Sequence, residues 1–375
     1  MSATHRTVPT ARLIESNSFF HDCPACTGAP TQPNRGDHYC MKREGGLRSC
    51  GVAPHNLHRM EITSVVAAAY GGPEVLSVVE SRLNDPGPDQ VLIEVRAAGT
   101  NPVDYKLYSG AYGDDPSNLP ISLGFEAAGI VTEVSGELEG PSGRIAVGDE
   151  VIVYSASGAY ASGLLSPASS VLAKPSTMSF DEASGLMLTG VTAIHALRAT
   201  KSTAGDTLLV HGAAGGVGLM AVQIAVADGV RVIGTASETQ QERLRNLGVE
   251  PVVYGDGLIE RIRALAPTGV TAAIDLVGTD EAVDVSVALV ANRERIATIV
   301  SSARSSSNGV QALGGGPGAD AGVEIRSAAR LELIRRVEEG SLRVFIAATY
   351  PLIEAAAAHR QLAAGHAHGK IILIP

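Results

Sequence analysis

The chain has 375 residues, of which 45% are apolar, and this is enough for two domains with buried cores. It contains no run of ~18 apolar residues, so no membrane-spanning helix is expected, and a net charge of −10 argues against a nucleic-acid-binding surface. All four cysteines fall in the first 50 residues, which leaves the remainder without disulfides or thiolate metal ligands and fits a reducing cytoplasm.

The first 59 residues are rich in His, Arg, Pro, Asn and Cys and show no hydrophobic periodicity. They also lack the basic-then-apolar layout of a secretory signal. Because an ordered pattern begins at Met60, we interpret residues 1–59 as an upstream translation or a disordered extension. The alternative is a small zinc knuckle formed by the four cysteines, of which only Cys23 and Cys26 have the CxxC spacing.

Residues 60–180 have the pattern of short strands separated by clusters of Gly, Pro and Asp, which is typical of a compact β domain. A helical stretch is predicted over 180–198. The predicted strands are 65–69, 91–97, 128–134, 150–154 and 171–174.

From Asp206 onward, strand and helix patterns alternate, which predicts a parallel sheet with helices on both faces. The Ser/Gly-rich residues 301–323 are predicted to form a loop, and an amphipathic helix is predicted over 324–339. The last strand, helix and strand (345–349, 353–364, 370–374) are expected to return to the first domain. Within the alternating region the predicted strands are 207–210, 230–234, 251–254, 272–275 and 295–300, and the predicted helices are 216–227, 240–247, 258–265 and 281–289.

Residues 208–225, LLVHGAAGGVGLMAVQIA, have the strand–turn–helix pattern of a dinucleotide-binding unit. Ala213, Gly215 and Gly218 occupy the three positions of the G-x-G-x-x-G fingerprint. The first position makes a tight turn, the second lets the backbone approach a pyrophosphate, and the third lets the helix pack close to the strand. The helix N-terminus then directs its N–H groups at the phosphates.

The end of the next predicted strand indicates which nicotinamide cofactor is bound. Ala236 falls where an NAD-selective site usually places Asp or Glu to hold the ribose 2′-OH. Ser237 is small and polar, and Arg243 follows on the next helix, so the site favours NADPH. Many relatives have a lysine near Gln240, which this chain lacks, and the alternative is that Arg243 merely solvates a helix face.

From Met60 onward the chain resembles the medium-chain dehydrogenase/reductase superfamily, specifically its zinc-free quinone oxidoreductase branch, which includes zeta-crystallin. The resemblance implies an α/β protein with two domains. A GroES-like β domain that binds substrate would span 60–184 and 325–375, and a Rossmann domain with a doubly wound parallel sheet would span 185–324. The matching segments are AAYGGPEVL (68–76), AAGTNPVDYKLYSG (97–110), LGFEAAGIV (123–131), GDEV (148–151), TGVTAIHAL (189–197), HGAAGGVGLMAVQ (211–223), LRNLGVEPVVYG (244–255) and HGKIIL (368–373).

The resemblance also bears on metal binding. The zinc alcohol dehydrogenases of the superfamily have a Cys in place of Asn101 and a His in place of Phe125. Neither Asn nor Phe is a usual zinc ligand, and Glu126 alone does not make a site. No metal is therefore expected.

The resemblance implies roles for individual residues in a cofactor cleft. Asn101 would line the nicotinamide or substrate face, although it could be a turn residue before Pro102. Thr192 would contact the nicotinamide carboxamide, unless its hydroxyl bonds its own helix backbone. The remaining cofactor-binding candidates are Ala214, Gly215, Gly216 and Val217 for the pyrophosphate, Ser237 and Arg243 for the 2′-phosphate, and Tyr254 for the adenosine.

Tyr105, Tyr108 and Tyr112 cluster in the segment that follows Asn101. One of them could donate a proton to an enolate, as a phenol can, although such tyrosines more often shape an aromatic pocket. Asp104 is expected to make a turn or an ion pair. His195 is expected to be a packed histidine bonded to a neighbour rather than a catalytic acid.

These features predict an NADPH-dependent oxidoreductase that transfers hydride to a quinone or an α,β-unsaturated carbonyl without a metal. The alternatives are a trans-2-enoyl thioester reductase and a low-turnover NADPH-binding protein. The expected partner is a small electrophilic substrate rather than a nucleic acid or a membrane. Relatives are commonly dimers, so a cytoplasmic homodimer is expected.

Overall fold

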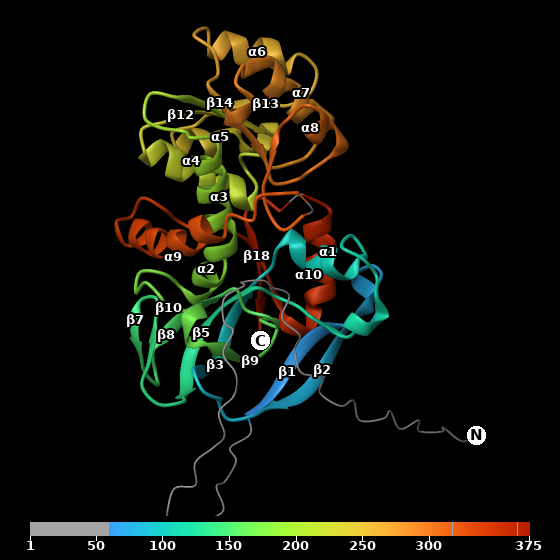
Figure 1. Ribbon diagram of the computed structural model, residues 1–375, viewed down its shortest axis with the longest axis vertical. Coiled ribbons are helices and arrows are strands. Elements are labelled where there is room, and N and C mark those ends of the chain that lie inside the picture. The colour runs from blue at the N-terminus through green and yellow to red at the C-terminus, as the bar shows by residue number, and fades with distance from the viewer. Residues whose placement is uncertain (1–59, 317, 366) are drawn as a thin grey trace, which may run out of the picture. The chain divides into compact units, whose positions relative to one another are not determined.

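The computed structural model describes residues 60–316, 318–365 and 367–375, and Figure 1 shows their arrangement. The predictions for residues 1–59, including the zinc knuckle, lie outside the described residues. Within them, no helix is long and apolar enough to cross a membrane. Two large sheets dominate, one mostly antiparallel and one fully parallel.

The mostly antiparallel sheet has seven strands, which lie within residues 90–173 and 346–374. Its order is β10-β8-β5-β3-β18-β17, with β9 also paired to β3. The last strand, β18, pairs antiparallel with β3 and parallel with β17, so the C-terminal strands join the N-terminal ones, as expected from the sequence. The strands are β3 (Gln90–Gly99), β5 (Glu126–Val134), β8 (Glu150–Tyr154), β9 (Gly163–Pro167), β10 (Val171–Ala173), β17 (Ile346–Pro351) and β18 (Lys370–Ile374).

A three-stranded sheet of order β2-β1-β4 is formed by β1 (Met60–Ala67), β2 (Leu76–Leu83) and β4 (Ile121–Ser122). The sequence patterns did not predict β2, β9 or the short helix α1 (Pro102–Tyr108). No residue of β2 is buried, so it lacks the apolar alternation that marks a half-buried strand. Its pairing with β1 is therefore a property of the folded chain.

The parallel sheet has the order β13-β12-β11-β14-β15-β16. Every residue of β11 and β14 is buried, as expected for a parallel sheet covered on both faces. The strand order reverses beside β11, and in such sheets ligands bind at the carboxyl ends of the strands next to this point. The strands are β11 (Thr207–His211), β12 (Arg231–Ala236), β13 (Glu250–Val253), β14 (Ala272–Asp275), β15 (Ile296–Thr298) and β16 (Gln311–Ala312).

The helices around the parallel sheet match the predicted ones closely, with one addition. Residues 301–323, predicted as a loop, include the short helix α8 (Ala303–Ser307) and the edge strand β16, so that prediction was wrong in part. These helices are α4 (Gly216–Ala227), α5 (Gln241–Asn246), α6 (Leu258–Leu265) and α7 (Asp280–Leu289). Of the remaining two, α9 (Val323–Glu338) packs on α3, and α10 (Ala355–Ala363) packs on β17 and β18 of the antiparallel sheet.

The predicted helix over 180–198 is two helices, α2 (Phe180–Ser184) and α3 (Met187–Ala199). The break falls at Gly185, where a Cβ would lie 2.9 Å from the Cγ of Lys370. A longer side chain at this position would collide with the lysine. The missing Cβ of Gly185 therefore leaves room for the Lys370 stem, a constraint that helical periodicity does not encode.

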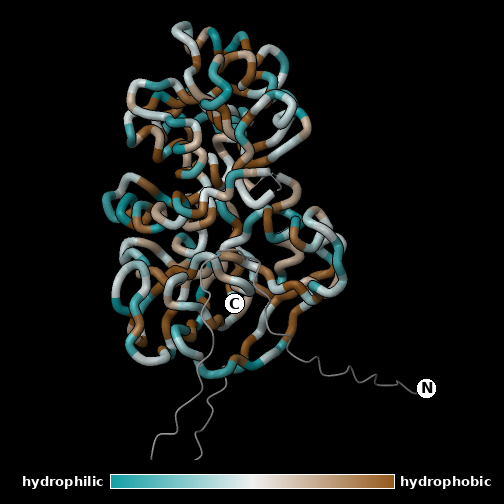
Figure 2. Tube along the Cα trace, viewed as in Figure 1, coloured by the Kyte–Doolittle hydropathy of each residue, from teal (hydrophilic) through white to brown (hydrophobic). Residues whose placement is uncertain are grey.

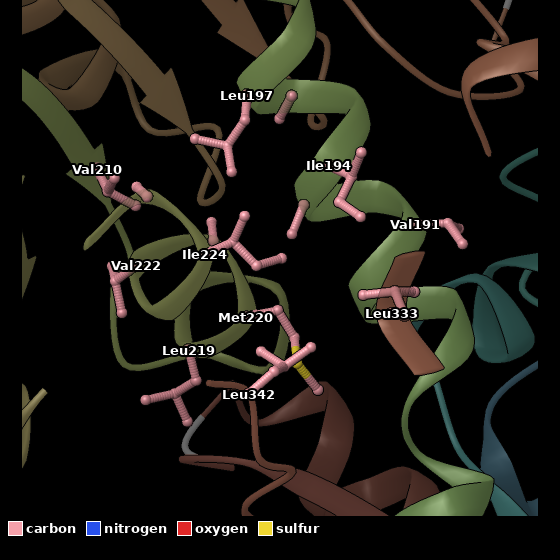
Figure 3. Close-up of a cluster of buried hydrophobic side chains, with 14 of the residues drawn as sticks. Val191, Ile194, Leu197, Val210, Leu219, Met220, Val222, Ile224, Leu333 and Leu342 are labelled. Atoms are coloured by element: carbon pink, nitrogen blue, oxygen red, sulfur yellow. The ribbon is translucent and has the colours of Figure 1, made fainter. Parts of the chain in front are cut away.

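Helix α3 is the centre of the largest apolar cluster, because it packs between α4 and α9. Figure 3 shows Leu197 of α3 directed toward the side chains of α4, and Leu333 of α9 packs against α3 at Gly190. In Figure 2, apolar residues gather along the strands and these inner helices, and polar residues gather in the connecting turns. This packing holds α3 against the end of the parallel sheet where the glycine-rich turn lies.

Candidate active site

The glycine-rich turn connects β11 to α4, and two of its glycines are required by geometry. Gly212 has φ +74°, in the left-handed region that favours glycine. A Cβ on Gly218 would lie 2.2 Å from the carbonyl oxygen of Gly212, which no side chain permits. The close helix–strand packing expected of Gly218 is therefore confirmed. The fingerprint alignment assigned the tight turn to Ala213. In the structure Gly212 makes it, because Gly212 has the left-handed backbone conformation.

The start of α4 presents backbone N–H groups to the space beside the turn. Gly215 is the N-cap residue, has extended backbone and makes no side-chain capping bond. A Cβ at Gly215 would meet only the Gly212 oxygen, at 3.4 Å, so this side of the turn is open. The first N–H groups of a helix have no partner within the helix, and here they lie at Gly216 and Val217. Such a terminus suits an anion.

The residues predicted to hold a 2′-phosphate lie beyond β12. Ser237 follows β12, and its hydroxyl bonds that of Thr239 at 3.1 Å. Arg243 donates from Nη1 to the backbone oxygen of His368 at 2.7 Å, and its guanidinium lies 5.5 Å from the ring centre of Phe345. Arg243 therefore contacts the C-terminal segment and is not simply a solvated helix residue.

Asn101 belongs to a buried polar cluster with Glu126 and Lys370. The Nζ of Lys370 donates to Asn101 Oδ1 at 2.7 Å, to Glu126 Oε1 at 2.8 Å and to the Thr100 backbone oxygen at 2.8 Å. Asn101 Nδ2 in turn donates to Glu126 Oε1 at 2.9 Å. The other oxygen of Glu126 accepts the backbone N–H of Leu188 at 2.8 Å. Every polar atom of the Lys370 and Glu126 side chains is thus bonded.

The Lys370 stem links this cluster to the glycine-rich turn. Its Cδ lies 3.9 Å from the position of a Cβ on Gly216. Thr189 of α3 also approaches Gly216, with its methyl 3.4 Å from the same position. The C-terminal strand, α3 and the start of α4 therefore meet at one place.

A second buried network begins at Asp104, which caps α1 by accepting the Asn101 backbone N–H at 2.7 Å. Asp104 Oδ2 also accepts the Tyr160 hydroxyl at 2.8 Å, and the two nitrogens of His359 bond the hydroxyls of Tyr160 (3.0 Å) and Tyr108 (2.7 Å). Burial raises the pKa of Asp104 to about 7, although the bond from Tyr160 opposes this rise. Burial lowers the pKa of His359 to about 4.

The tyrosines predicted beside Asn101 have different environments. Tyr108 is buried, with its hydroxyl bonded to His359, so it forms part of the wall rather than an accessible acid. Tyr105 is half-buried, and none of the hydrogen bonds found among the described residues uses its hydroxyl. Tyr112 and Tyr254 are exposed.

Thr192 lies on α3, one turn beyond Thr189. Its hydroxyl donates to the Leu188 backbone oxygen at 2.7 Å and accepts Nη1 of Arg326 at 3.0 Å. From the sequence, the alternative role of the Thr192 hydroxyl was a bond to its own helix backbone, and this bond is present. It uses the hydroxyl proton, and Arg326 uses one lone pair, so the second lone pair can accept a hydrogen bond from a ligand. His195 is buried and bonds Asp320 at 3.1 Å, as expected for a packed histidine.

The comparisons with known proteins agree on the family. Two family models match, "Alcohol dehydrogenase GroES-like domain" over residues 87–176 and "Zinc-binding dehydrogenase" over residues 247–373. The quinone oxidoreductase of Pseudomonas aeruginosa is 35% identical over 333 residues, which cover 82% of this chain and 98% of that protein. The chain belongs to the quinone oxidoreductase branch of the medium-chain dehydrogenase/reductases.

Solved structures of the family have the same fold. Escherichia coli quinone oxidoreductase complexed with NADPH is 30% identical, with a TM-score of 0.71, and the match covers 84% of this chain and all of that one. A mycobacterial protein complexed with NADPH is 31% identical, with a TM-score of 0.71 and the same coverage of both chains. The GroES-like and Rossmann fold class expected from the sequence is thereby confirmed.

One of the matching family models is named for zinc. The residues of the present chain nevertheless do not fit a catalytic zinc ion. Such a site needs three Cys, His, Asp or Glu ligands. By the family resemblance, Asn101 and Phe125 occupy the positions of a Cys and a His that bind zinc in the zinc alcohol dehydrogenases. Both oxygens of Glu126 already accept hydrogen bonds. No cluster of three or more metal-ligating side chains occurs in the described part of the chain. The Lys370 ammonium supplies the positive charge beside Glu126.

Sequence reasoning did not assign roles to Lys370 and Arg326. The segment HGKIIL (368–373) was one of the family matches, so Lys370 was marked by its motif but not by its chemistry. Arg326 lies in an ordinary helical pattern that gives no signal of its contact with Thr192. Both contacts depend on which helices and strands become neighbours.

Proposed function

We propose that this protein is an NADPH-dependent reductase of quinones or α,β-unsaturated carbonyls that needs no metal. The observation that carries the proposal is the Lys370 ammonium between Asn101 and Glu126, beside an open dinucleotide turn. The names of the relatives, quinone oxidoreductases with NADPH complexes among them, support the same cofactor and reaction class. We infer in addition that the protein is a cytoplasmic homodimer, as the family resemblance implies.

The glycine-rich turn and its surroundings suit NADPH. Ala214, Gly215, Gly216 and Val217 would hold the pyrophosphate through backbone N–H groups, because no side chain blocks their approach. We assign Ser237 and Arg243 to the 2′-phosphate and the exposed Tyr254 to the adenosine face. Bound NADPH supplies the hydride.

Thr192 is assigned to the nicotinamide carboxamide. Its hydroxyl proton is used by Leu188, and one lone pair is used by Arg326, so it can only accept one further hydrogen bond. The carboxamide N–H is a donor of the required kind. Thr192 lies one helical turn from Thr189, whose methyl approaches Gly216, so it is on the same helix as a residue that contacts the turn.

The proposed site of the electron acceptor is lined by two buried side chains that are held by hydrogen bonds and by one tyrosine whose hydroxyl is not held. Asn101 and Tyr108 are fully buried and internally bonded, so they orient the wall and keep water out. Tyr105 is half-buried, and its hydroxyl is used by none of the hydrogen bonds found among the described residues, so it is available to an acceptor oxygen. Because a reduced quinone takes its proton readily from solvent, no dedicated acid is required. An enone requires a proton at its α-carbon, for which Tyr105 is our candidate.

The proposal is tested by following NADPH absorbance with the full chain, a panel of quinones and enones, and a chelator. We expect NADPH oxidation that EDTA does not change and that is slower with NADH. Loss of activity with EDTA would refute metal independence. NADPH binding without turnover of any acceptor would instead favour a low-turnover binding protein.

A further inference from the structure

The arginines of α9 differ in whether they form ion pairs with carboxylates. Near the C-terminal end, Arg335 pairs with Glu339 at 2.6 Å, and Arg336 pairs with Asp228 and Glu332 at 2.9 Å. Near the N-terminal end, Arg326 and Arg330 make no ion pair with any carboxylate that the structure describes. Like charges four residues apart on a helix repel. The charge of Asp320 acts on Arg326 but forms no ion pair with it, and a bound anion would offset the repulsion between the two arginines.

The guanidinium of Arg326 is held in place by α3. Its Nη1 donates to Thr192 at 3.0 Å, and its Nε donates to Nδ1 of His195 at 3.3 Å. Nε2 of His195 bonds Asp320 at 3.1 Å, which assigns the imidazole proton to Nε2 and leaves Nδ1 as the acceptor. The packing is tight, because a Cβ on Gly322 would lie 2.3 Å from the imidazole. A guanidinium has five N–H donors, so donors remain.

Tyr154 of β8 is the register partner of Glu126, which accepts the backbone N–H of Leu188, and the Leu188 oxygen accepts the Thr192 hydroxyl. Burial raises the pKa of the Tyr154 hydroxyl, and the positive charges of Arg326 and Arg330 oppose this rise. Arg330 is held by the backbone oxygens of Ser169 (2.9 Å) and Ser327 (3.2 Å), which are neutral acceptors. Arg326 therefore contacts Thr192 directly, Arg330 lies one turn further along α9, and Tyr154 is connected to Thr192 through Glu126 and Leu188.

We propose that Arg326 and Arg330, with the hydroxyl of Tyr154, bind a carboxylate group on the electron acceptor. The inference rests on the proposed function, which puts the nicotinamide at Thr192 and hence the acceptor next to it. Planar guanidiniums bind carboxylates through paired N–H donors, and a phenol adds a further donor. The enzyme would therefore prefer quinones or enones that carry a carboxylate over matched neutral ones.

The first test compares a neutral 1,4-naphthoquinone with the same quinone bearing a carboxymethyl group. The variants are Arg330→Gln, Arg326→Gln and, as matched control on the same helix, Arg335→Gln. Because charge-assisted hydrogen bonds are lost, we expect KM for the carboxylated quinone to rise about 10- to 100-fold in the first two variants. In Arg330→Gln, KM for the neutral quinone should change less than about twofold. Arg330→Gln is the cleaner variant, because Arg330 makes no bond to Thr192.

The second test measures benzoate binding to the full-length protein by calorimetry, which does not depend on turnover. We expect benzoate to bind the wild type and the Arg335→Gln variant but not the Arg330→Gln variant. Equal KM values for the two quinones in the wild type, or benzoate binding that survives Arg330→Gln, would refute the proposal. A rise in KM for NADPH in place of the acceptor would also refute it, since the arginines would then serve a cofactor phosphate. If no quinone is reduced, the proposed function fails, and calorimetry still decides whether the arginines bind a carboxylate.

Discussion

The glycine-rich turn and the polar cluster of Asn101, Glu126 and Lys370 lie side by side but are built in opposite ways. The turn is contiguous in sequence, and its constraints are backbone constraints: a left-handed φ at Gly212 and no room for a Cβ at Gly218. The cluster joins side chains 25 and 244 residues apart in sequence, and its constraints are charge and burial. A backbone site can therefore be recognised from a short motif, whereas a side-chain cluster depends on how distant strands pair.

Substitutions destabilise the two regions for different physical reasons. The turn has no charges, so an added atom harms it through steric overlap. The cluster has a buried ammonium and a buried carboxylate, so removing one partner leaves the other desolvated and unpaired. Substitutions can separate these two modes of failure.

The largest effect is expected for Lys370→Met. This change leaves the Glu126 carboxylate buried without its counter-ion, and breaking such pairs costs about 3–5 kcal/mol of unfolding free energy. Urea denaturation measures the loss. The control is the double variant Lys370→Met/Glu126→Gln, which removes both charges and should recover much of it. A single variant as stable as the wild type would show that the cluster does not contribute in this way.

A somewhat smaller loss is expected for Gly218→Ala. The new Cβ would meet the backbone oxygen of Gly212 at 2.2 Å, and overpacking of this kind costs about 1–3 kcal/mol. The matched control is Gly215→Ala, whose Cβ would be 3.4 Å from the same oxygen in extended backbone. It should unfold like the wild type but bind NADPH more weakly, because the methyl blocks the pyrophosphate approach. Thermal unfolding and NADPH fluorescence titration separate the two; identical behaviour of both variants would contradict these distinct roles.

A further expected effect is a pH dependence due to Asp104. Burial holds its pKa at about 7 in the folded protein, whereas the unfolded carboxyl titrates near 3.8. The folded state therefore holds a proton that the unfolded state loses, and this group's contribution to stability is present below pH ~4 and lost as the pH rises to ~7. Asp104→Asn keeps an acceptor for Tyr160 without this titration. Its stability relative to the wild type should rise by at most about 1.4 kcal/mol per pH unit across that window.

The histidines act in the opposite direction, so the comparison must be with the wild type at each pH. Burial lowers the pKa values of His359 and His211 to about 4, and their contribution is present above pH ~6.5 and lost as the pH falls. Both histidines remain in the Asp104→Asn variant, and their effect cancels in the difference. The exposed Asp256→Asn variant is the control for losing a carboxylate. A difference independent of pH in urea denaturation would show that Asp104 is ionised throughout.

Local patterns predicted most of the secondary structure where each element buries its own apolar residues. The predicted strands and helices of the alternating region were found within two residues of their predicted ends, because parallel strands and their covering helices are strongly apolar. The prediction failed for features that depend on residues distant in sequence. Examples are β2, which has no buried residue, and the break between α2 and α3, where Gly185 leaves room for Lys370.

The sequence by itself determined the dinucleotide turn, the quinone oxidoreductase resemblance and the absence of the usual zinc ligands at Asn101 and Phe125. These are properties of residue type at fixed spacing, and spacing is what a chain specifies locally. Only the tertiary structure decided that Lys370 lies between Asn101 and Glu126 and that Arg326 lies against Thr192. The pairing of β18 with β3 and the packing of α9 on α3 produce those contacts, because a side chain meets partners that are distant in sequence only after the whole sheet and its helices have formed.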